Sequence, residues 1–216
     1  MTDARLDHPA GGPAVSAVVF DLGGVLIDWD PRYLYRSLFG GDEAAMERFL
    51  ATVCTPEWNR GQDAGRPWSE AIASLVAEHP EHADLIRAFW DRWPETLGDA
   101  IDPTVDVLAE LRAAGIPLYA LSNWSAETFP IARPRYPFLD WFDGIVISGE
   151  VGAAKPDPRI YQALVERHGL DPASLAFVDD VPANVAAAES LGIRGLTFTS
   201  AAALRQDLAA LGLPIA

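Results

Sequence analysis

The chain is poor in cysteine, and its few histidines are not spaced as metal ligands. Cys54 is the only cysteine among 216 residues, so no internal disulfide can form, and a reducing compartment suits the chain. No histidine is placed to activate a thiol, so we expect Cys54 to be buried rather than catalytic. The histidines also lack ligand spacing and are expected at the surface: they are His8, His79, His82 and His168.

Positive charge is scarce as well. Lysine and arginine number 16 against 31 aspartates and glutamates, which gives a net charge of −15 at pH 7. This charge disfavours nucleic acid and acidic membranes as partners. A small anionic substrate is still compatible with it, because a lysine or a metal ion can reverse the local potential. We therefore expect a small anionic substrate, no nucleic-acid or membrane partner, and a monomer or homodimer.

Long apolar runs are absent too. No stretch approaches the roughly 18 apolar residues that a membrane span requires. Residues 1–13 include Asp3, Asp7 and a Gly-Gly-Pro sequence but no apolar segment, so they do not resemble a signal peptide. We predict a disordered N-terminus over 1–13 and a cytoplasmic protein.

The remaining composition is typical of a globular protein, with half of the residues hydrophobic and seven tryptophans. After a first strand at 15–20, helix-like and strand-like segments alternate from about residue 103 onward. This alternation predicts an α/β fold with a parallel sheet and right-handed crossovers. The predicted strands are 116–121, 144–148, 175–178 and 195–198. The predicted helices are 104–114, 125–132, 158–168, 182–191 and 201–211.

Residues 33–97 interrupt this alternation, because they show only helical patterning. The segment is too long for an ordinary crossover between parallel strands. We predict a helical cap inserted after the first strand, above the carboxyl ends of the sheet; the alternative is that these helices cover a sheet face. The predicted domains are a core at 14–30 and 98–216 and a cap at 31–97.

Four short polar segments follow apolar, strand-like runs or lie a short loop beyond one. They are Asp21-Leu22-Gly23-Gly24, Ser122-Asn123, Lys155-Pro156 and Asp179-Asp180. Loops at the carboxyl ends of parallel strands converge on one crevice, where ligands bind. The sequence therefore predicts one acidic site of phosphate size, built from all four segments.

Each segment has a chemical and a structural interpretation. Asp21 can act as a covalent nucleophile or cap a turn. Asp179 and Asp180, near a third carboxylate, favour a Mg²⁺ ion with oxygen ligands, or they cap the next helix. Ser122 and Asn123 can form a phosphate cradle with a helix that begins near Ser125, although both residue types are ordinary helix caps. Taken together, the segments indicate a reaction centre more strongly than any one of them alone.

The order of these motifs resembles the haloacid dehalogenase-like hydrolase superfamily, and the resemblance covers the chain from Val15 onward. It implies a Rossmann-like parallel-sheet core with a helical cap, and Mg²⁺-dependent hydrolysis of a phosphate ester through an aspartyl-enzyme intermediate. By position, Asp21 resembles the nucleophile and a metal ligand, and Lys155 the lysine that steadies the phosphoryl group. Ser122 and Asn123 resemble the phosphate-binding motif. The remaining metal ligands are implied at Asp179, Asp180 and the backbone carbonyl of Gly23.

Gly23 departs from the family pattern, because its phosphatases usually have an aspartate there as general acid and base. Loss of a general acid typically lowers the reaction rate 10²–10⁴-fold for a substrate with a poor leaving group. An activated phosphate ester would suffer less, and Asp28 or Asp30 could supply the proton. A 2-haloacid dehalogenase is the alternative, with the substrate carboxylate held by Arg32 or Arg36. A further alternative is a weakly active binding module.

The cap is expected to select the substrate. Several of its residues are predicted where it meets the crevice, and one tryptophan among them is expected in the pocket wall. These residues are Trp29, Trp58, Trp68, Asn59, Arg60 and Arg66.

Overall fold

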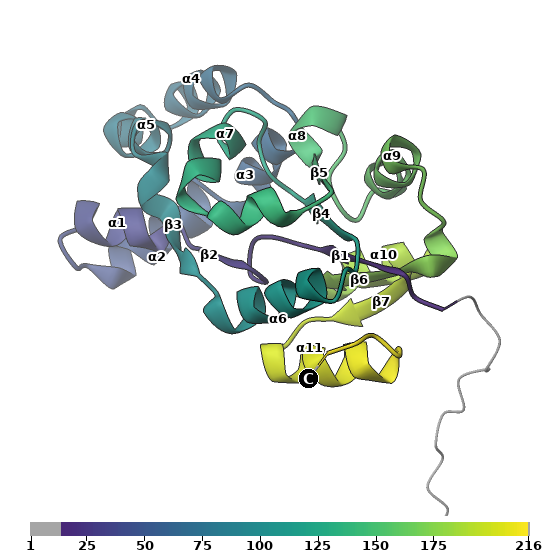
Figure 1. Cartoon of the computed structure of the whole chain (residues 1–216). Helices are drawn as coiled ribbons and strands as arrows, with labels where there is room; N and C mark the ends of the chain where they lie inside the picture. The colour runs from purple at the N-terminus through teal and green to yellow at the C-terminus, as the bar shows by residue number, and fades with distance from the viewer. Residues whose placement is uncertain (1–13, 216) are drawn as a thin grey trace, which may run out of the picture.

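The computed structural model describes residues 14–215, and its centre is a sheet of five parallel strands in the order β5-β4-β1-β6-β7 (Figure 1). The strands are β1 (Ala17–Phe20), β4 (Leu118–Ser122), β5 (Gly144–Ile147), β6 (Leu175–Asp179) and β7 (Arg194–Thr197). Strand β1 is central, and its Val18 lies opposite Leu118 of β4 and Ala176 of β6. From β1 the chain passes through the helical region to β4 and β5 on one side of β1, and then crosses to β6 and β7 on the other side. This change of direction opens a crevice at the carboxyl end of β1. The predicted α/β fold is confirmed.

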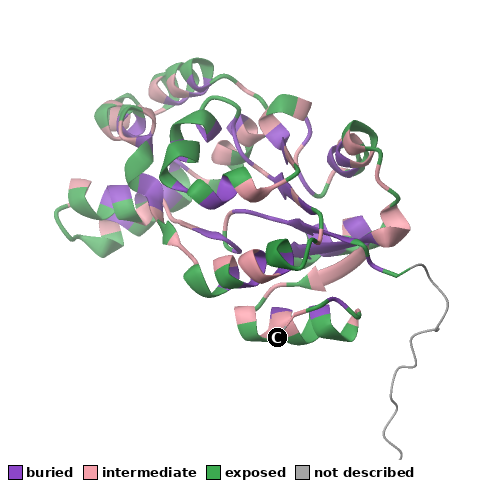
Figure 2. Ribbon diagram, in the orientation of Figure 1, coloured by how far each residue is buried: buried purple, intermediate pink, exposed green. Residues whose placement is uncertain are grey.

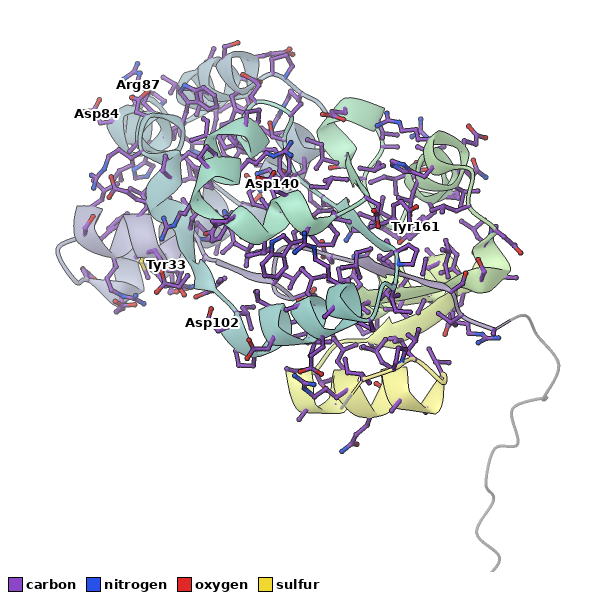
Figure 3. The ribbon with its side chains drawn as sticks, in the orientation of Figure 1. Tyr33, Asp84, Arg87, Asp102, Asp140 and Tyr161 are labelled. Carbon is purple, nitrogen blue, oxygen red and sulfur yellow. The ribbon has the colours of Figure 1, made fainter. Side chains whose placement is uncertain are left out.

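Helices cover both faces of this sheet. Helices α6 (Asp102–Ala113) and α11 (Ala201–Ala210) pack on one face, and α9 (Pro158–His168) and α10 (Pro182–Ser190) on the other (Figure 1). Tyr161 of α9 lies between its helix and the sheet (Figure 3), where its hydroxyl donates to the Asn184 carbonyl oxygen at 2.8 Å.

The apolar sequence of β1 follows from this sandwich. Successive side chains of a strand point to opposite faces. Val18 and Phe20 therefore join the core cluster that contains residues of α6 and α11, and Val19 joins the cluster beneath α9 and α10. A parallel strand buried on both faces has no polar side, which explains its continuous apolar run. Strands β1 and β6 are buried at every residue (Figure 2).

Along the chain, five helices come between β1 and β4, the next strand of the sheet. They gather at one end of the sheet (Figure 1). They are α1 (Arg32–Leu38), α2 (Glu43–Thr52), α3 (Pro56–Asp63), α4 (Trp68–Glu78) and α5 (Ala83–Asp91). Strand β2 (Ile27–Trp29) precedes these helices in the chain and β3 (Leu97–Ala100) follows them, and the two strands pair as an antiparallel ribbon. The sequence patterning did not predict this ribbon. The division into a core and a cap remains a prediction.

An aromatic cluster holds these five helices together. Trp58 of α3 packs on Trp68 of α4 and on Phe89 of α5, with ring centroids 5.7 and 5.6 Å apart. Trp68 and Phe89 are 5.4 Å apart. Edge-to-face aromatic pairs add to the stabilisation from buried area. Trp58 and Trp68 are therefore packing residues of the helical region.

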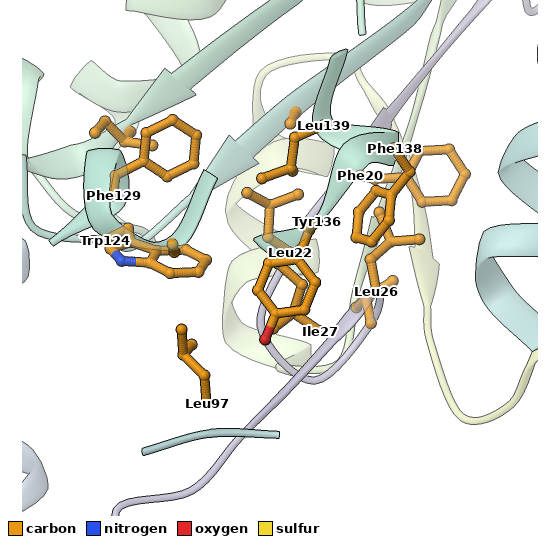
Figure 4. Close-up of a cluster of buried hydrophobic side chains, with 14 of the residues drawn as sticks. Phe20, Leu22, Leu26, Ile27, Leu97, Trp124, Phe129, Tyr136, Phe138 and Leu139 are labelled. Atoms are coloured by element: carbon orange, nitrogen blue, oxygen red, sulfur yellow. The ribbon is translucent and has the colours of Figure 1, made fainter. Parts of the chain in front are cut away.

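Another part of the same core cluster fixes the loop that follows β1 (Figure 4). Leu22, Leu26 and Ile27 pack with Trp124 and Phe129 and with apolar residues of the short 3₁₀ turns after them. The Tyr136 hydroxyl donates to the Gly98 carbonyl oxygen at 2.7 Å, which ties one of these turns to β3. The carboxyl end of β1 is thus held by packing on both sides.

The remaining helical elements are short. They are α7 (Phe129–Ala132), α8 (Ser148–Val151) and the 3₁₀ turns Pro80–His82, Trp93–Thr96, Arg133–Arg135, Pro137–Trp141 and Pro172–Ser174. The predicted helix at 125–132 is wrong over its first half. The Ser125 hydroxyl accepts from the Glu127 N–H at 3.2 Å, and the Ser125 carbonyl accepts from Thr128 and Phe129. Such local hydrogen bonds favour a turn over a helix.

Two smaller expectations can also be compared with the fold. Cys54 is buried, as predicted, and burial raises the pKa of its thiol to about 12. The predicted disorder over 1–13 lies outside the described residues. Within residues 14–215, no helix is long and apolar enough to cross a membrane.

Candidate active site

Asp21 lies directly after β1, and one of its carboxylate oxygens is held by three donors. Oδ1 accepts from the Leu22 N–H at 2.7 Å and from the Ser122 hydroxyl at 2.8 Å, and it lies 2.9 Å from Lys155 Nζ. Among residues 14–215, none donates a hydrogen bond to Oδ2. The carboxylate is therefore fixed through one oxygen, and the other is available to a ligand.

Lys155 is the buried cation of the site, with 4% of its surface exposed. Its ammonium group lies 2.7 Å from Asp179 Oδ2 and 2.9 Å from Asp21 Oδ1, and it donates to the Leu121 carbonyl at 2.8 Å. An ammonium has three donors, and all three have partners here. Lys155 thus joins the ends of β1, β4 and β6.

Asn123 holds the Lys155 segment in place. Its side-chain amide donates to the Lys155 carbonyl oxygen at 3.0 Å, and its side-chain oxygen accepts from the Lys155 N–H at 2.7 Å. Both polar atoms of the side chain are occupied by backbone. The phosphate contact predicted for Asn123 is not tested by this arrangement, but its side chain is clearly engaged in positioning Lys155.

Asp179 and Asp180 differ sharply although they are adjacent. Asp179 is fully buried, and its oxygens accept from the Val181 N–H at 2.8 Å and from the Asn184 amide at 3.0 and 3.1 Å, besides Lys155. Asp180 is exposed and lies against Gly24, where a Cβ would come within 2.6 Å of Asp180 Oδ2. Gly24 also has a φ of 74°, so both its space and its conformation favour glycine.

The three acids form a cluster that suits a hard cation. Ligand atoms from Asp21, Asp179 and Asp180 all lie within 4.8 Å of one another. Lys155 is the one buried cation beside them, so negative charge remains in excess. Carboxylate oxygens are the ligands that Mg²⁺ prefers. The residues present therefore fit a magnesium ion.

Burial and the neighbouring charge of Asp179 both raise the pKa values of Asp21 and Asp180. Burial raises the pKa of Asp21, and the charge of Asp179 adds to the effect, whereas Lys155 opposes it. Burial also raises the pKa of Asp180, again with a contribution from Asp179. A bound divalent cation would lower both pKa values, because it stabilises the ionised carboxylates.

Residues 15–192 match the family of haloacid dehalogenase-like hydrolases. The chain belongs to this family. It is 30% identical to phosphatase MT3486 of Mycobacterium tuberculosis, with 92% of this chain and 96% of that protein covered. It is 28% identical to the sesquiterpene phosphatase astK of Aspergillus oryzae, with 89% and 94% covered.

Two further comparisons bear on length and fold. The chain is 29% identical to acyl-CoA dehydrogenase family member 10 of Mus musculus but spans only 20% of that protein. A HAD family enzyme of Bacteroides thetaiotaomicron, solved with magnesium and inorganic phosphate, superposes with a TM-score of 0.64 at 25% identity, covering 86% of this chain and 94% of that one. The resemblance seen in the motifs is thereby confirmed.

One cavity adjoins Ser122 and Asn123 in the site of this hydrolase, and a second shares part of its lining. The smaller, of about 120 Å³, is lined from the sheet side by Gly23, Ser122 and Asn123. The larger, of about 500 Å³, lies among α1, α2, α3 and α5 and has apolar walls that include Leu50 and Phe89. Three residues line both cavities: Trp29, Asn59 and Asp63.

Of the three tryptophans considered for the pocket wall, Trp29 lines both cavities. Trp93 and Trp124, which were not predicted, line the smaller one. Asn59 and Arg60 also line a cavity, as expected of residues where the helices meet the crevice. Arg66 instead donates to the Gln62 side chain and the Trp58 carbonyl.

Neither acid suggested as a replacement for the missing one lines these two cavities. Asp28 accepts from the Tyr33 hydroxyl, and Asp30 accepts from the Arg32 N–H at 2.9 Å. Asp63, which does line them, was missed by the sequence analysis. Its one sequence signal is the i, i+4 pairing with Asn59, which places both side chains on one face of a helix.

Proposed function

We propose that the protein is a Mg²⁺-dependent phosphatase that hydrolyses a small phosphate monoester through an aspartyl-phosphate on Asp21. The observation that carries the proposal is the clamped carboxylate of Asp21, with three donors on Oδ1 and none on Oδ2. A nucleophile held in one orientation loses little freedom on reaching the transition state. Oδ2 would attack phosphorus, and the alcohol of the ester would leave.

The surrounding residues have distinct roles in this proposal. Lys155 would neutralise charge on the nucleophile and the phosphoryl group, and Asp179 would position Lys155. Ser122 and Asn123 line the smaller cavity, where the phosphoryl group would bind. Magnesium, when bound, would be held by Asp21, Asp180 and the Gly23 carbonyl, with Asp179 close by, and would offset the charge of the phosphoryl oxygens.

The larger cavity suggests the kind of alcohol that leaves. Its walls include apolar side chains from three helices, among them Leu50, Ala51 and Phe89. Ligand pockets lined in this way take apolar groups that a few polar residues orient. Similarity to a sesquiterpene phosphatase supports the same inference. We infer that the alcohol portion of the substrate is at least partly apolar.

A 2-haloacid dehalogenase fits the site less well. Arg32, expected to hold the substrate carboxylate in that case, is paired with Glu47 and Asp30. Arg36 is paired with Glu43 at the surface. The acidic cluster would also repel an anionic haloacid in the absence of a cation.

Metal removal tests the proposed function. We expect excess chelator to abolish release of phosphate from p-nitrophenyl phosphate and from acetyl phosphate, and added Mg²⁺ to restore it. A parallel assay should detect no chloride release from 2-chloropropionate. Full phosphatase activity in chelator would contradict the metal dependence, and chloride release without Mg²⁺ would favour the dehalogenase.

A further inference from the structure

Gly23 leaves the first motif without a proton donor, yet the space for one is present. A Cβ added to Gly23 would have no atom within 4 Å. Asp28 and Asp30 are engaged elsewhere and line neither of the two cavities that share Asp63. Some other group must therefore supply the proton, or the enzyme depends on leaving groups that need none.

Asp63 is the carboxyl group in a suitable position. It is the last residue of α3, a helix capped by the Thr55 hydroxyl, which accepts from the Trp58 N–H at 3.1 Å. The Asn59 amide donates to Asp63 Oδ2 at 3.3 Å, and the backbone of Ser125 lies near enough to the same carboxyl group to lower its pKa. These contacts hold Asp63 from its own helix and from the loop that follows Asn123.

The two cavities place Asp63 near the bond that breaks. The smaller cavity is lined by residues proposed to bind the phosphoryl group, and the larger by the apolar residues proposed to bind the alcohol. Asp63 is one of three residues common to both. The others, Trp29 and Asn59, have side chains that do not exchange protons near neutral pH. The oxygen that joins phosphoryl group and alcohol would lie where the cavities meet.

The surroundings of Asp63 favour a carboxyl group that holds a proton near neutral pH. Burial raises its pKa from 3.8 to about 7, and the charge of Asp21 adds to the effect, whereas the Ser125 backbone opposes it. The other charged residues that line the larger cavity form ion pairs. Arg32 is paired with Glu47, and Arg60 is paired with Glu57. Among residues 14–215, no cation opposes the raised pKa of Asp63, whereas Lys155 opposes that of Asp21.

We propose that Asp63 is the general acid and base of the reaction, in the role that an aspartate at position 23 would otherwise have. The proposal rests on the phosphatase function proposed above. In the first step Asp21 Oδ2 bonds to phosphorus, the bond from phosphorus to the alcohol oxygen breaks, and the Asp63 proton passes to that oxygen. In the second step water attacks phosphorus and gives a proton to Asp63, the bond to Asp21 breaks, and inorganic phosphate leaves.

The test compares Asp63→Asn with the wild type over a series of phosphate esters, from n-butyl phosphate through phenyl phosphate to p-nitrophenyl phosphate. The value of kcat/KM reports the steps up to departure of the leaving group. We expect Asp63→Asn to lower it 10²–10⁴-fold for n-butyl phosphate, the usual effect of a lost general acid, and less than about tenfold for p-nitrophenyl phosphate. Asp91 is an exposed acid on α5, so Asp91→Asn is the matched control. It should leave kcat/KM unchanged for both n-butyl phosphate and p-nitrophenyl phosphate.

A rescue experiment separates proton donation from a structural role. Because a side chain at Gly23 meets open space, Gly23→Asp in the Asp63→Asn background should restore activity on n-butyl phosphate at least tenfold. Loss of the base should also let phosphorylated Asp21 accumulate in Asp63→Asn, detectable by rapid quenching and mass spectrometry. A structural defect would produce neither effect.

The outcomes distinguish this inference from the function on which it rests. If the wild type shows no Mg²⁺-dependent release of phosphate from any ester, the phosphatase assignment fails. If the wild type is active and Asp63→Asn retains its rate on n-butyl phosphate, Asp63 is not the acid. Equal losses on all esters without rescue by Gly23→Asp would likewise overturn the proposal.

Discussion

On the sheet side of the cavities, Asp21, Lys155 and Asp179 share a continuous set of hydrogen bonds, whereas on the helical side Asp63 faces the same space with far fewer partners. The sheet-side groups come from strand ends whose positions are set by the β ladder. Asp63 comes from a helix end that packs on other helices and on one loop. The two sides therefore differ in how rigidly they hold a charge.

The sheet side and the helical side suit different chemistry because they hold their charged groups with different numbers of partners. Buried charges are stable only when they are paired, and the sheet side pairs its charges through Lys155. Such a network can keep a nucleophile ionised and oriented. The helical side offers apolar walls and a carboxyl group whose pKa burial raises to about 7, which suits binding of an alcohol and transfer of a proton.

The largest expected effect comes from breaking the sheet side at its centre. Asp21→Asn removes the nucleophilic oxygen while preserving the shape of the side chain, so turnover should fall by about 10⁴-fold or more, as when other covalent nucleophiles are removed. Steady-state release of phosphate from p-nitrophenyl phosphate measures the loss. Circular dichroism should show an intact fold. Substantial residual turnover would mean that an activated water, not Asp21, attacks phosphorus.

The matched control for that variant is Asp84→Asn. Asp84 is exposed on α5 beside Arg87 (Figure 3), with N and O atoms 3.3 Å apart. Exposed pairs of this kind contribute about 1 kcal/mol or less. Asp84→Asn should leave turnover unchanged.

A smaller effect is expected from filling the larger cavity on the helical side. Ala51→Phe adds bulk to a residue of α2 that lines it, so kcat/KM for phenyl phosphate should fall about tenfold, the scale of a lost apolar contact in a pocket. Acetyl phosphate, with its small leaving group, should be almost unaffected. Ala44→Phe, exposed at the other end of the same helix, is the control. Equal losses on both substrates would place the alcohol elsewhere.

The smallest expected effect is on stability, and it sharpens the electrostatic part of the comparison. The pKa of Asp63 is raised from 3.8 to about 7 on folding, so the folded state binds more protons than the unfolded state between these values. Stability contributed by protonated Asp63 is complete below about pH 4 and is lost as the pH rises through about 7. Asp63→Asn cannot ionise, so it should be the more stable protein at pH 8, by about 1–3 kcal/mol.

Urea unfolding of the metal-free proteins at pH 4 and pH 8 measures this difference. Asp63→Asn and the wild type should differ least at pH 4, and Asp91→Asn should follow the wild type at both. If Asp63→Asn is the less stable protein at pH 8, its carboxylate is stabilised in the folded state, and the direction of the shift is wrong.

Much of the fold could be predicted from local patterns. The helix α9 begins and ends as expected because Asp157 caps it, Pro158 begins it and Gly169 ends it. Strands β1, β4 and β6 are continuous apolar runs that end in polar residues, which identifies both the strands and the ends where ligands bind. The helix expected at 125–132 failed because the hydrogen bonds of Ser125 and Thr128 compete with helix formation, and residue spacing does not record that competition.

The sequence by itself determined the composition of the acidic centre: Asp21, Ser122, Lys155 and Asp179 had to meet once their strands became parallel neighbours. Only the tertiary structure decided which oxygens remain available, since Asp179 is fully bonded and Asp180 is not. It also decided that Asp63, rather than Asp28 or Asp30, lines the same cavity as Gly23. The reason is physical: a motif follows from neighbours along the chain, whereas the place of α3 beside this cavity depends on how the helices pack.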